Sequence, residues 1–217
     1  MGREAAHVTR RMLLRATGAA ATGLAWMGLS GCAIRPSKDA LVARDYSSLS
    51  LDRGAWRHDE VNDIYYQVGV SYCLSPAAPD FESLGVYVPG AYLSARANVG
   101  GETYTCSINP DGSIGGYTAA TAPVVMPIDT VGFGAQEAPS SYSAEGVVPY
   151  TSAGLVYVRA GCRGRASGTS GDGSHYDGGV PWGVTDLKAA VRYLRYNADS
   201  LPGSMDRIFT FGHSSGG

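Results

Sequence analysis

Charged residues are scarce in this chain. Only 17% of its 217 residues are Asp, Glu, Lys or Arg, against about a quarter in an average soluble protein. The two signs nearly balance, with 17 Lys and Arg and 19 Asp and Glu, and no run of basic residues occurs. Nucleic-acid binding needs a dense set of cationic side chains against the phosphates, so we expect no nucleic-acid partner.

The chain also lacks an apolar run of the roughly 20 residues that a membrane-spanning helix needs. The best candidate, residues 16–29, is short, weakly apolar and preceded by Arg15. It follows Arg10-Arg11, in a pattern typical of twin-arginine export signals. Residues 29–32, Leu-Ser-Gly-Cys, resemble a bacterial lipobox, in which cleavage leaves the cysteine, here Cys32, to be acylated.

These patterns predict a signal peptide over residues 1–31, then a lipidated Cys32 and a polar tether over residues 32–60. The resemblance implies export in the folded state and a lipid-anchored or extracellular protein of the bacterial cell envelope. An ordinary secretory signal with an incidental cysteine is the alternative. Without residues 1–31 the chain keeps 13 basic and 18 acidic residues, a net charge of −5.

Cysteines are few, and three remain after Cys32: Cys73, Cys106 and Cys162. In an oxidising compartment, one disulfide and one free thiol is the simplest arrangement. The sequence does not determine which pair forms. The spacing of these cysteines, without companion histidine pairs, gives no metal signature, so we expect no metal ion.

Five stretches rich in β-forming residues predict strands: 64–74, 84–89, 122–128, 155–158 and 208–211. The unbroken apolar run at 155–158 is typical of a parallel strand that is buried on both faces. Residues 90–121 are rich in glycine and threonine with little hydrophobic pattern, which indicates an insertion.

Between the last two strands, apolar residues recur at helical spacing. The stripe consists of Val184, Leu187, Val191, Leu194 and Ala198. A strand, a helix and a second strand in this order form a crossover unit of a parallel sheet. We therefore predict an α/β domain over residues 61–217, with a mostly parallel sheet flanked by helices.

The chain ends with the pattern G-x-S-x-G, at residues 212–216, directly after the strand 208–211. The pattern alone is weak in a sequence with 30 Gly and 22 Ser. Its position after a strand and a crossover helix is what identifies it as a nucleophile elbow. In that turn the serine hydroxyl projects from the sheet, and flanking glycines avoid a clash where the chain doubles back.

Four segments together resemble bacterial tannases and feruloyl-esterase-like carboxylesterases: residues 156–165, 186–197, 202–208 and 212–217. The resemblance covers roughly residues 120–217 and is most specific from Asp186 onward. It implies an α/β-hydrolase that cleaves small-molecule esters, including those of gallic or other phenolic acids. It also implies that no cofactor takes part.

The resemblance makes Ser214 the nucleophile and the backbone N–H of Ser215 one oxyanion donor. The second donor should lie in the loop after the third strand, where we favour Gly132, although a simple glycine turn would look the same. The His-Gly-Gly loop usual in the family is absent here. Arg163 and Arg165 could contact a carboxylate or phenolic substrate, or they could be ordinary solvated arginines.

In this fold the catalytic acid and histidine follow the serine in the chain. All four histidines, His7, His58, His175 and His213, precede or adjoin Ser214. The sequence as given therefore ends at the elbow without a complete triad. Two other functions stay open. One is a serine peptidase of the prolyl-oligopeptidase type, although the chain has too few residues for a propeller. The other is a non-catalytic, lipid-anchored binding domain.

The 217-residue chain by itself is expected to show no serine-hydrolase turnover, because a serine without its base is a poor nucleophile. A fluorophosphonate probe measures this directly, and labelling above background would contradict the expectation. Sequencing the DNA after the Gly217 codon separates the alternatives. An in-frame acid followed by a histidine favours the esterase, and an immediate stop counts against it for this product.

Overall fold

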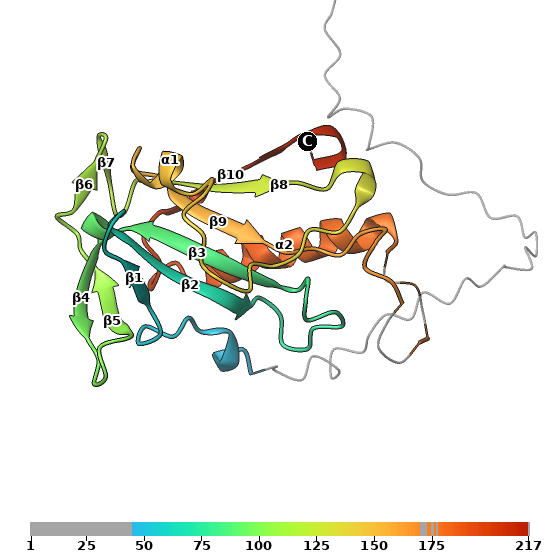
Figure 1. The fold of residues 1–217 in the computed structure, drawn as a ribbon, viewed down its shortest axis with the longest axis horizontal. Coiled ribbons are helices and arrows are strands. Elements are labelled where there is room, and N and C mark those ends of the chain that lie inside the picture. The colour runs from blue at the N-terminus through green and yellow to red at the C-terminus, as the bar shows by residue number, and fades with distance from the viewer. Residues whose placement is uncertain (1–44, 170–172, 175, 177, 217) are drawn as a thin grey trace, which may run out of the picture. The chain divides into compact units, whose positions relative to one another are not determined.

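The computed structural model describes residues 45–169, 173, 174, 176 and 178–216, which form one compact unit (Figure 1). Its centre is a six-stranded sheet. In spatial order the strands are β1 (Arg57–Asp59), β2 (Ile64–Ser71), β3 (Ser83–Pro89), β9 (Val156–Ala160), β8 (Pro123–Ile128) and β10 (Ser204–Gly212). The predicted signal peptide and Cys32 lie outside the described residues.

The sheet is mixed. Two pairs of strands are parallel, β9 with β8 and β8 with β10. Three pairs are antiparallel: β1 with β2, β2 with β3, and β3 with β9. The expectation of a mostly parallel sheet is therefore wrong, although all five predicted strands are present. The crossover visible in the sequence describes only the parallel half. In the other half, β1, β2 and β3 form a meander with short connections, and β3 then pairs with β9, which follows after 66 intervening residues in the chain.

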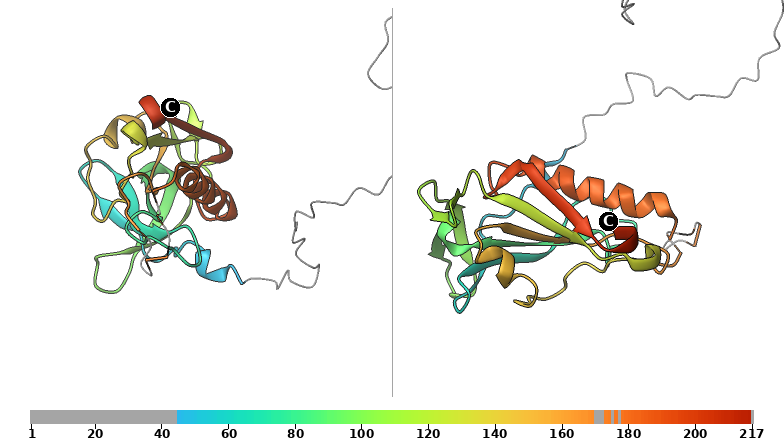
Figure 2. Two further views of the ribbon diagram at one scale, coloured as in Figure 1. Left: turned by 90° about the vertical axis from the view of Figure 1, so that its right-hand side faces the viewer. Right: turned by 90° about the horizontal axis from the view of Figure 1, so that it is seen from above.

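The predicted helix is α2, Val180–Tyr196, which begins with Pro181 in its first turn, where a missing N–H costs nothing. It lies along one face of the sheet (Figure 2). In the described part of the chain the only other α-helix is α1, the single turn Val148–Thr151, so flanking helices are fewer than expected.

The buried face of α2 matches the predicted stripe in part. Leu194 is buried, and Leu187 and Val191 pack half-buried against the core, whereas Val184 and Ala198 are exposed. Asp186, Ala190 and Tyr193 are buried in addition. Polar contacts account for part of this difference: Arg163 pairs with Asp186, and Asn197, just beyond the last turn, bonds to the chain before β1. A hydrophobic pattern cannot show such contacts.

Residues 45–60, expected to belong to a tether, are folded against the sheet. Leu51 and Trp56 are 5% and 1% exposed. The Asn197 amide accepts a hydrogen bond from Leu51 N–H (2.7 Å) and donates to the Leu49 carbonyl (2.9 Å). The Asn197 side chain thus supplies the hydrogen-bond partners of two backbone groups in residues 49–51. The folded part of the chain therefore begins before residue 61.

The glycine- and threonine-rich region 90–121 is an excursion, but an ordered one. It contains two hairpins, β4 (Leu93–Ala97) with β5 (Tyr104–Ile108) and β6 (Ser113–Ile114) with β7 (Tyr117–Thr118). Tyr92, at its start, is fully buried and donates a hydrogen bond to the Gly154 carbonyl (2.7 Å). That contact fastens the excursion to the main sheet.

The expected disulfide is not formed, and Cys73, Cys106 and Cys162 are all free. Cys106 packs in the main hydrophobic core and Cys162 follows β9, each almost completely buried among other side chains. Burial raises the pKa of the Cys106 thiol to about 11, so it remains protonated at neutral pH.

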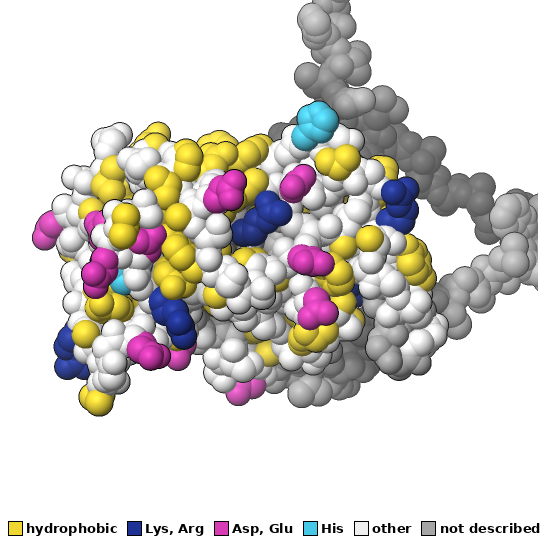
Figure 3. All heavy atoms as spheres, in the orientation of Figure 1, with side chains coloured by type: hydrophobic (Ala, Val, Ile, Leu, Met, Phe, Trp, Pro, Cys, Tyr) yellow, Lys and Arg dark blue, Asp and Glu magenta, His cyan; other side chains and the backbone are white. Residues whose placement is uncertain are grey.

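Within the described ranges, every buried side-chain nitrogen and oxygen has a hydrogen-bond partner. No helix there has the length and apolar character needed to cross a membrane. On the face shown in Figure 3, acidic and basic side chains are scattered among neutral ones. This face thus agrees with the sparse, mixed charge of the sequence.

Replacement of Asn197 by alanine should lower the free energy of unfolding by about 2–3 kcal/mol, because it removes the partners of a buried backbone N–H and a partly buried carbonyl. The exposed residue Asp199 provides the control, since Asp199→Ala should change the free energy of unfolding by less than about 0.5 kcal/mol. Urea unfolding of both variants measures the difference. Equal effects would show that the amide does not hold the N-terminal segment.

Candidate active site

β10 ends at Gly212, and the chain turns sharply into a short 3-10 helix, Ser214–Gly216. Ser214 has a backbone φ of +59°. This left-handed conformation is unfavourable for a residue with a side chain, and it occurs mainly where surrounding structure enforces it. The Ser214 side chain is exposed. A strained, exposed serine at a strand-to-helix turn is the geometry of a nucleophile elbow.

Both glycines of the pattern are required by close approach of backbones. A Cβ added to Gly212 or to Gly216 would lie well within 3.0 Å of the Ile128 carbonyl oxygen, at the end of β8. A Cβ on Gly212 would also meet the Gly216 backbone. The predicted clash is therefore real, and it involves the neighbouring strand as well as the returning chain.

The segment after β8, residues 129–136, reaches the elbow. Its tip is a 3-10 turn, Val131–Phe133, in which Gly132 and Phe133 both have left-handed backbone, with φ of +66° and +59°. Phe133 N–H donates to Ser215 Oγ (2.8 Å), and Ser215 Oγ donates to the Thr130 carbonyl. The loop in which an oxyanion donor was predicted thus lies against Ser215.

The base of this loop is closed by a side chain that sequence reasoning missed. Gln136, 2% exposed, accepts a hydrogen bond from Asp129 N–H (2.6 Å) and donates to the carbonyl of Ala160, at the end of β9. Its backbone also pairs with Cys162. One residue therefore ties the loop to two strands. A lone glutamine in a loop carries no sequence signal of this role.

A cavity of about 250 Å³ opens beside the elbow. Ser215, Gly216, Phe133 and Arg163 line it, together with the first two turns of α2. Cys162 is also in its wall, but burial raises the pKa of that thiol, and thiols react as thiolates. Ser214 itself is not in the wall, but it directly precedes Ser215, which is.

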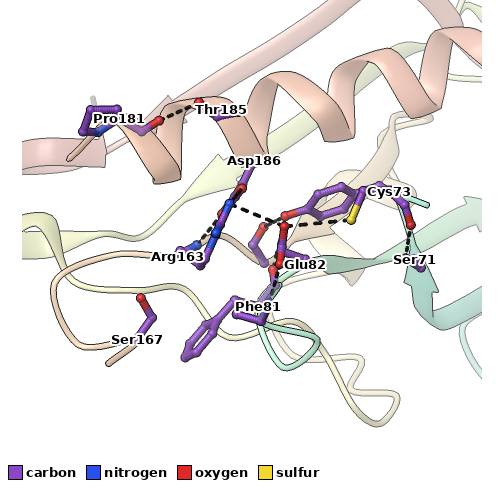
Figure 4. A network of polar contacts seen from close by, with 12 residues as sticks. Ser71, Cys73, Phe81, Glu82, Arg163, Ser167, Pro181, Thr185 and Asp186 are labelled. Carbon is purple, nitrogen blue, oxygen red and sulfur yellow. Dashed lines mark hydrogen bonds and ion pairs between the residues drawn. The ribbon is translucent and has the colours of Figure 1, made fainter. Parts of the chain in front are cut away.

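Arg163 is held in a buried ion-pair network (Figure 4). Its guanidinium contacts both oxygens of Asp186, Nη2 to Oδ1 at 2.8 Å and Nε to Oδ2 at 3.0 Å, and its backbone N–H also donates to Oδ2. Glu82 Oε1 lies 3.5 Å from Nη2. The ring of Trp182 stacks 4.8 Å from the guanidinium carbon.

This arrangement differs from the solvent-facing arginine that the sequence suggested. Arg163 is 6% exposed and its charge is already matched by two carboxylates. Its contacts fasten the end of β9, the helix α2 and the segment before β3 to one another. Asp186 and Glu82 were not identified as site residues, because their partner is distant in sequence.

Arg165 has a different position. It is exposed, its backbone N–H donates to the Phe133 carbonyl (2.7 Å), and its Nη2 would lie 3.6 Å from a Cβ added to Gly132. The structure thus separates the two predicted arginines: Arg163 is paired inside the protein, and Arg165 lies at the surface beside the candidate oxyanion loop.

The two described histidines do not form a catalytic pair. His58 Nε2 lies 3.1 Å from Asp63 Oδ1, and its ring stacks on Tyr65. His213 is exposed and lines a second cavity of about 570 Å³, with Tyr150 and Phe211. No metal-binding group of three or more His, Cys, Asp or Glu residues occurs in the described part of the chain.

No protein-family model matches the chain, and no curated protein matches it in sequence. Several solved structures do match the chain. A tannase from Fusobacterium nucleatum is 26% identical, with a TM-score of 0.61 over 79% of this chain and 34% of that one. A tannin acyl hydrolase from Lactobacillus plantarum is 29% identical, with a TM-score of 0.58 over 77% of this chain and 35% of that one.

A third match, 29% identical with a TM-score of 0.58, is a tannin acyl hydrolase in complex with ethyl gallate, covering 77% of this chain and 36% of that one. The chain therefore spans about a third of the length of the tannases that it matches. The described fold is tannase-like and of the α/β type. The resemblance seen in the sequence is confirmed at this level.

The two arginines should differ in their effect on stability. Arg163→Leu leaves Asp186 and Glu82 buried without a cation, so it should lower the free energy of unfolding by about 3–5 kcal/mol. Arg165→Leu, at the surface, should change it by less than about 0.5 kcal/mol. Chemical denaturation measures both, and a stable Arg163→Leu variant would refute the structural role of the network.

Proposed function

We propose that this chain carries the nucleophile and oxyanion region of a serine hydrolase that cleaves esters of phenolic acids. The observation that carries the proposal is the conformation of Ser214, with φ of +59° between two glycines that admit no side chain. The tannases that share its fold at 26–29% identity support the ester and the phenolic acid as the substrate class.

In the proposed reaction, Ser214 Oγ attacks the ester carbonyl and loses its proton to a general base. The tetrahedral intermediate expels the alcohol to leave an acyl-serine, which water then hydrolyses. The described residues contain no histidine placed to act as that base. They contribute the nucleophile and the groups that stabilise the negative oxygen.

The backbone N–H of Ser215 is the first proposed oxyanion donor. The N–H of Phe133 is already bonded to the Ser215 hydroxyl, so within the loop tip Gly132 is the better candidate for the second. Gly132 also lacks a side chain that would block the approach of a substrate. Donors fixed before the reaction stabilise developing charge most strongly.

Arg165 is the proposed contact for a phenolic or carboxylate group of the substrate. It is exposed, cationic and next to Gly132, whereas the charge of Arg163 is matched internally. One of the matching tannin acyl hydrolases was solved with 3,4-dihydroxybenzoate, a phenolic carboxylate. That ligand supports an aromatic acid as the acyl part of the substrate.

The test is hydrolysis of ethyl gallate by the full-length polypeptide that carries this sequence, followed by the release of gallic acid. Ser214→Ala should lower kcat by a factor of about 10⁴ or more, because it removes the covalent step. Ser94→Ala, on the exposed strand β4, is a matched serine control and should keep the wild-type rate. Equal rates for Ser214→Ala and wild type would exclude Ser214 as the nucleophile.

A further inference from the structure

The hydroxyl of Ser215 joins two parts of the chain that are far apart in sequence. It accepts a hydrogen bond from Phe133 N–H (2.8 Å) and donates one to the Thr130 carbonyl. These residues lie 82 and 85 positions before it. A hydroxyl can donate and accept at the same time, so one side chain satisfies an N–H and a carbonyl of the same turn.

The loop tip needs such a contact, because its backbone is strained. Phe133 has φ of +59°, which costs energy for a residue with a side chain, and it follows Gly132, also left-handed. The Phe133 ring is 55% exposed, so packing of that ring does not supply the compensation. The Phe133 carbonyl accepts a hydrogen bond from Arg165 N–H. The Phe133 N–H and the Thr130 carbonyl are bonded to the Ser215 hydroxyl, which is the side chain that links the tip to the elbow.

The base and the tip of the loop are held by different groups. Gln136 closes the base through Asp129 N–H and the Ala160 carbonyl, both on the sheet side. Ser215 fixes the tip, and it does so from the elbow itself. The position of the tip relative to Ser214 is therefore set by the residue that directly follows Ser214.

We infer that Ser215 is a positioning residue, in addition to its backbone role: its hydroxyl keeps the Val131–Phe133 turn in register with the nucleophile. The inference rests on the proposed function, because the register matters if Gly132 and Ser215 both donate to the oxyanion. Two donors stabilise the same oxygen only while their separation stays fixed. Ser215 Oγ thus couples the second donor to the first.

Loss of this hydroxyl should affect the transition state more than the bound substrate. The ground-state ester carries little charge on its carbonyl oxygen, whereas the tetrahedral intermediate carries a full negative charge. We therefore expect kcat to fall and KM to stay nearly constant. Because the second donor is displaced rather than deleted, the fall should be about 10–100-fold, below the 10²–10³-fold that removal of a donor causes.

The sharpest experiment compares Ser215→Thr with Ser215→Val in the full-length polypeptide. Threonine and valine have the same shape, so any crowding by the added methyl group affects both, and only threonine keeps the hydroxyl. We expect kcat for ethyl gallate to be about 10–100-fold higher for Ser215→Thr than for Ser215→Val, with similar KM values. Affinity for an arylboronic acid, which forms a tetrahedral adduct with the nucleophile, should differ by the same factor.

Equal kcat values for the two variants would overturn the inference, as would a wild-type kcat for Ser215→Ala, which introduces no crowding. Hydrogen exchange of the Phe133 amide provides a readout that does not depend on turnover. Exchange should be slow in wild type and Ser215→Thr and fast in Ser215→Ala and Ser215→Val. Slow exchange in all four proteins would mean that other contacts hold the loop.

The failure of this inference can be told apart from the failure of the proposed function. If Ser214→Ala keeps the full rate, the proposed function fails, whatever Ser215 does. If Ser214→Ala abolishes hydrolysis while Ser215→Thr and Ser215→Val have equal kcat values, only the positioning role is wrong.

Discussion

The carbonyl oxygen of Ile128 is the point on which the candidate site depends. It projects from the end of β8 into the space where Gly212 and Gly216 both pass, and neither position has room for a Cβ. The chain can therefore reverse within a few residues, and the reversal forces Ser214 into a left-handed conformation. The same strand then leads into the loop that bonds to Ser215. One close contact between neighbouring strands thus places the proposed nucleophile and the proposed oxyanion loop together.

Much of the fold could be predicted from the sequence, because the relevant signals are local. The apolar run at residues 155–158 and the helical repeat that begins at Val184 mark the crossover unit without any knowledge of distant residues. Gly212 and Gly216 predict the elbow for the same reason, because the pattern that contains them is local. The antiparallel half of the sheet could not be predicted, since strand direction depends on which strands pair and no short motif records that.

The misses around the candidate site share a physical cause: each involves a polar side chain buried by a partner that is distant in sequence. Asp186 was not part of the predicted apolar stripe, and its ion pair with Arg163 is buried. Gln136 carries no pattern, yet it closes the loop of the candidate site through two strands. Buried polar groups are costly unless every partner is present. Such residues can only be recognised once the fold has brought the partners together.

The Asn197 amide has a consequence for how the protein reaches its native state. Leu51 and Leu49 obtain their hydrogen bonds from a residue 146 and 148 positions later. A ribosome must therefore have synthesised nearly all of the described chain before the first folded segment can dock. The N-terminal segment is in that sense among the last of the described parts to become native, although it is the first to be synthesised.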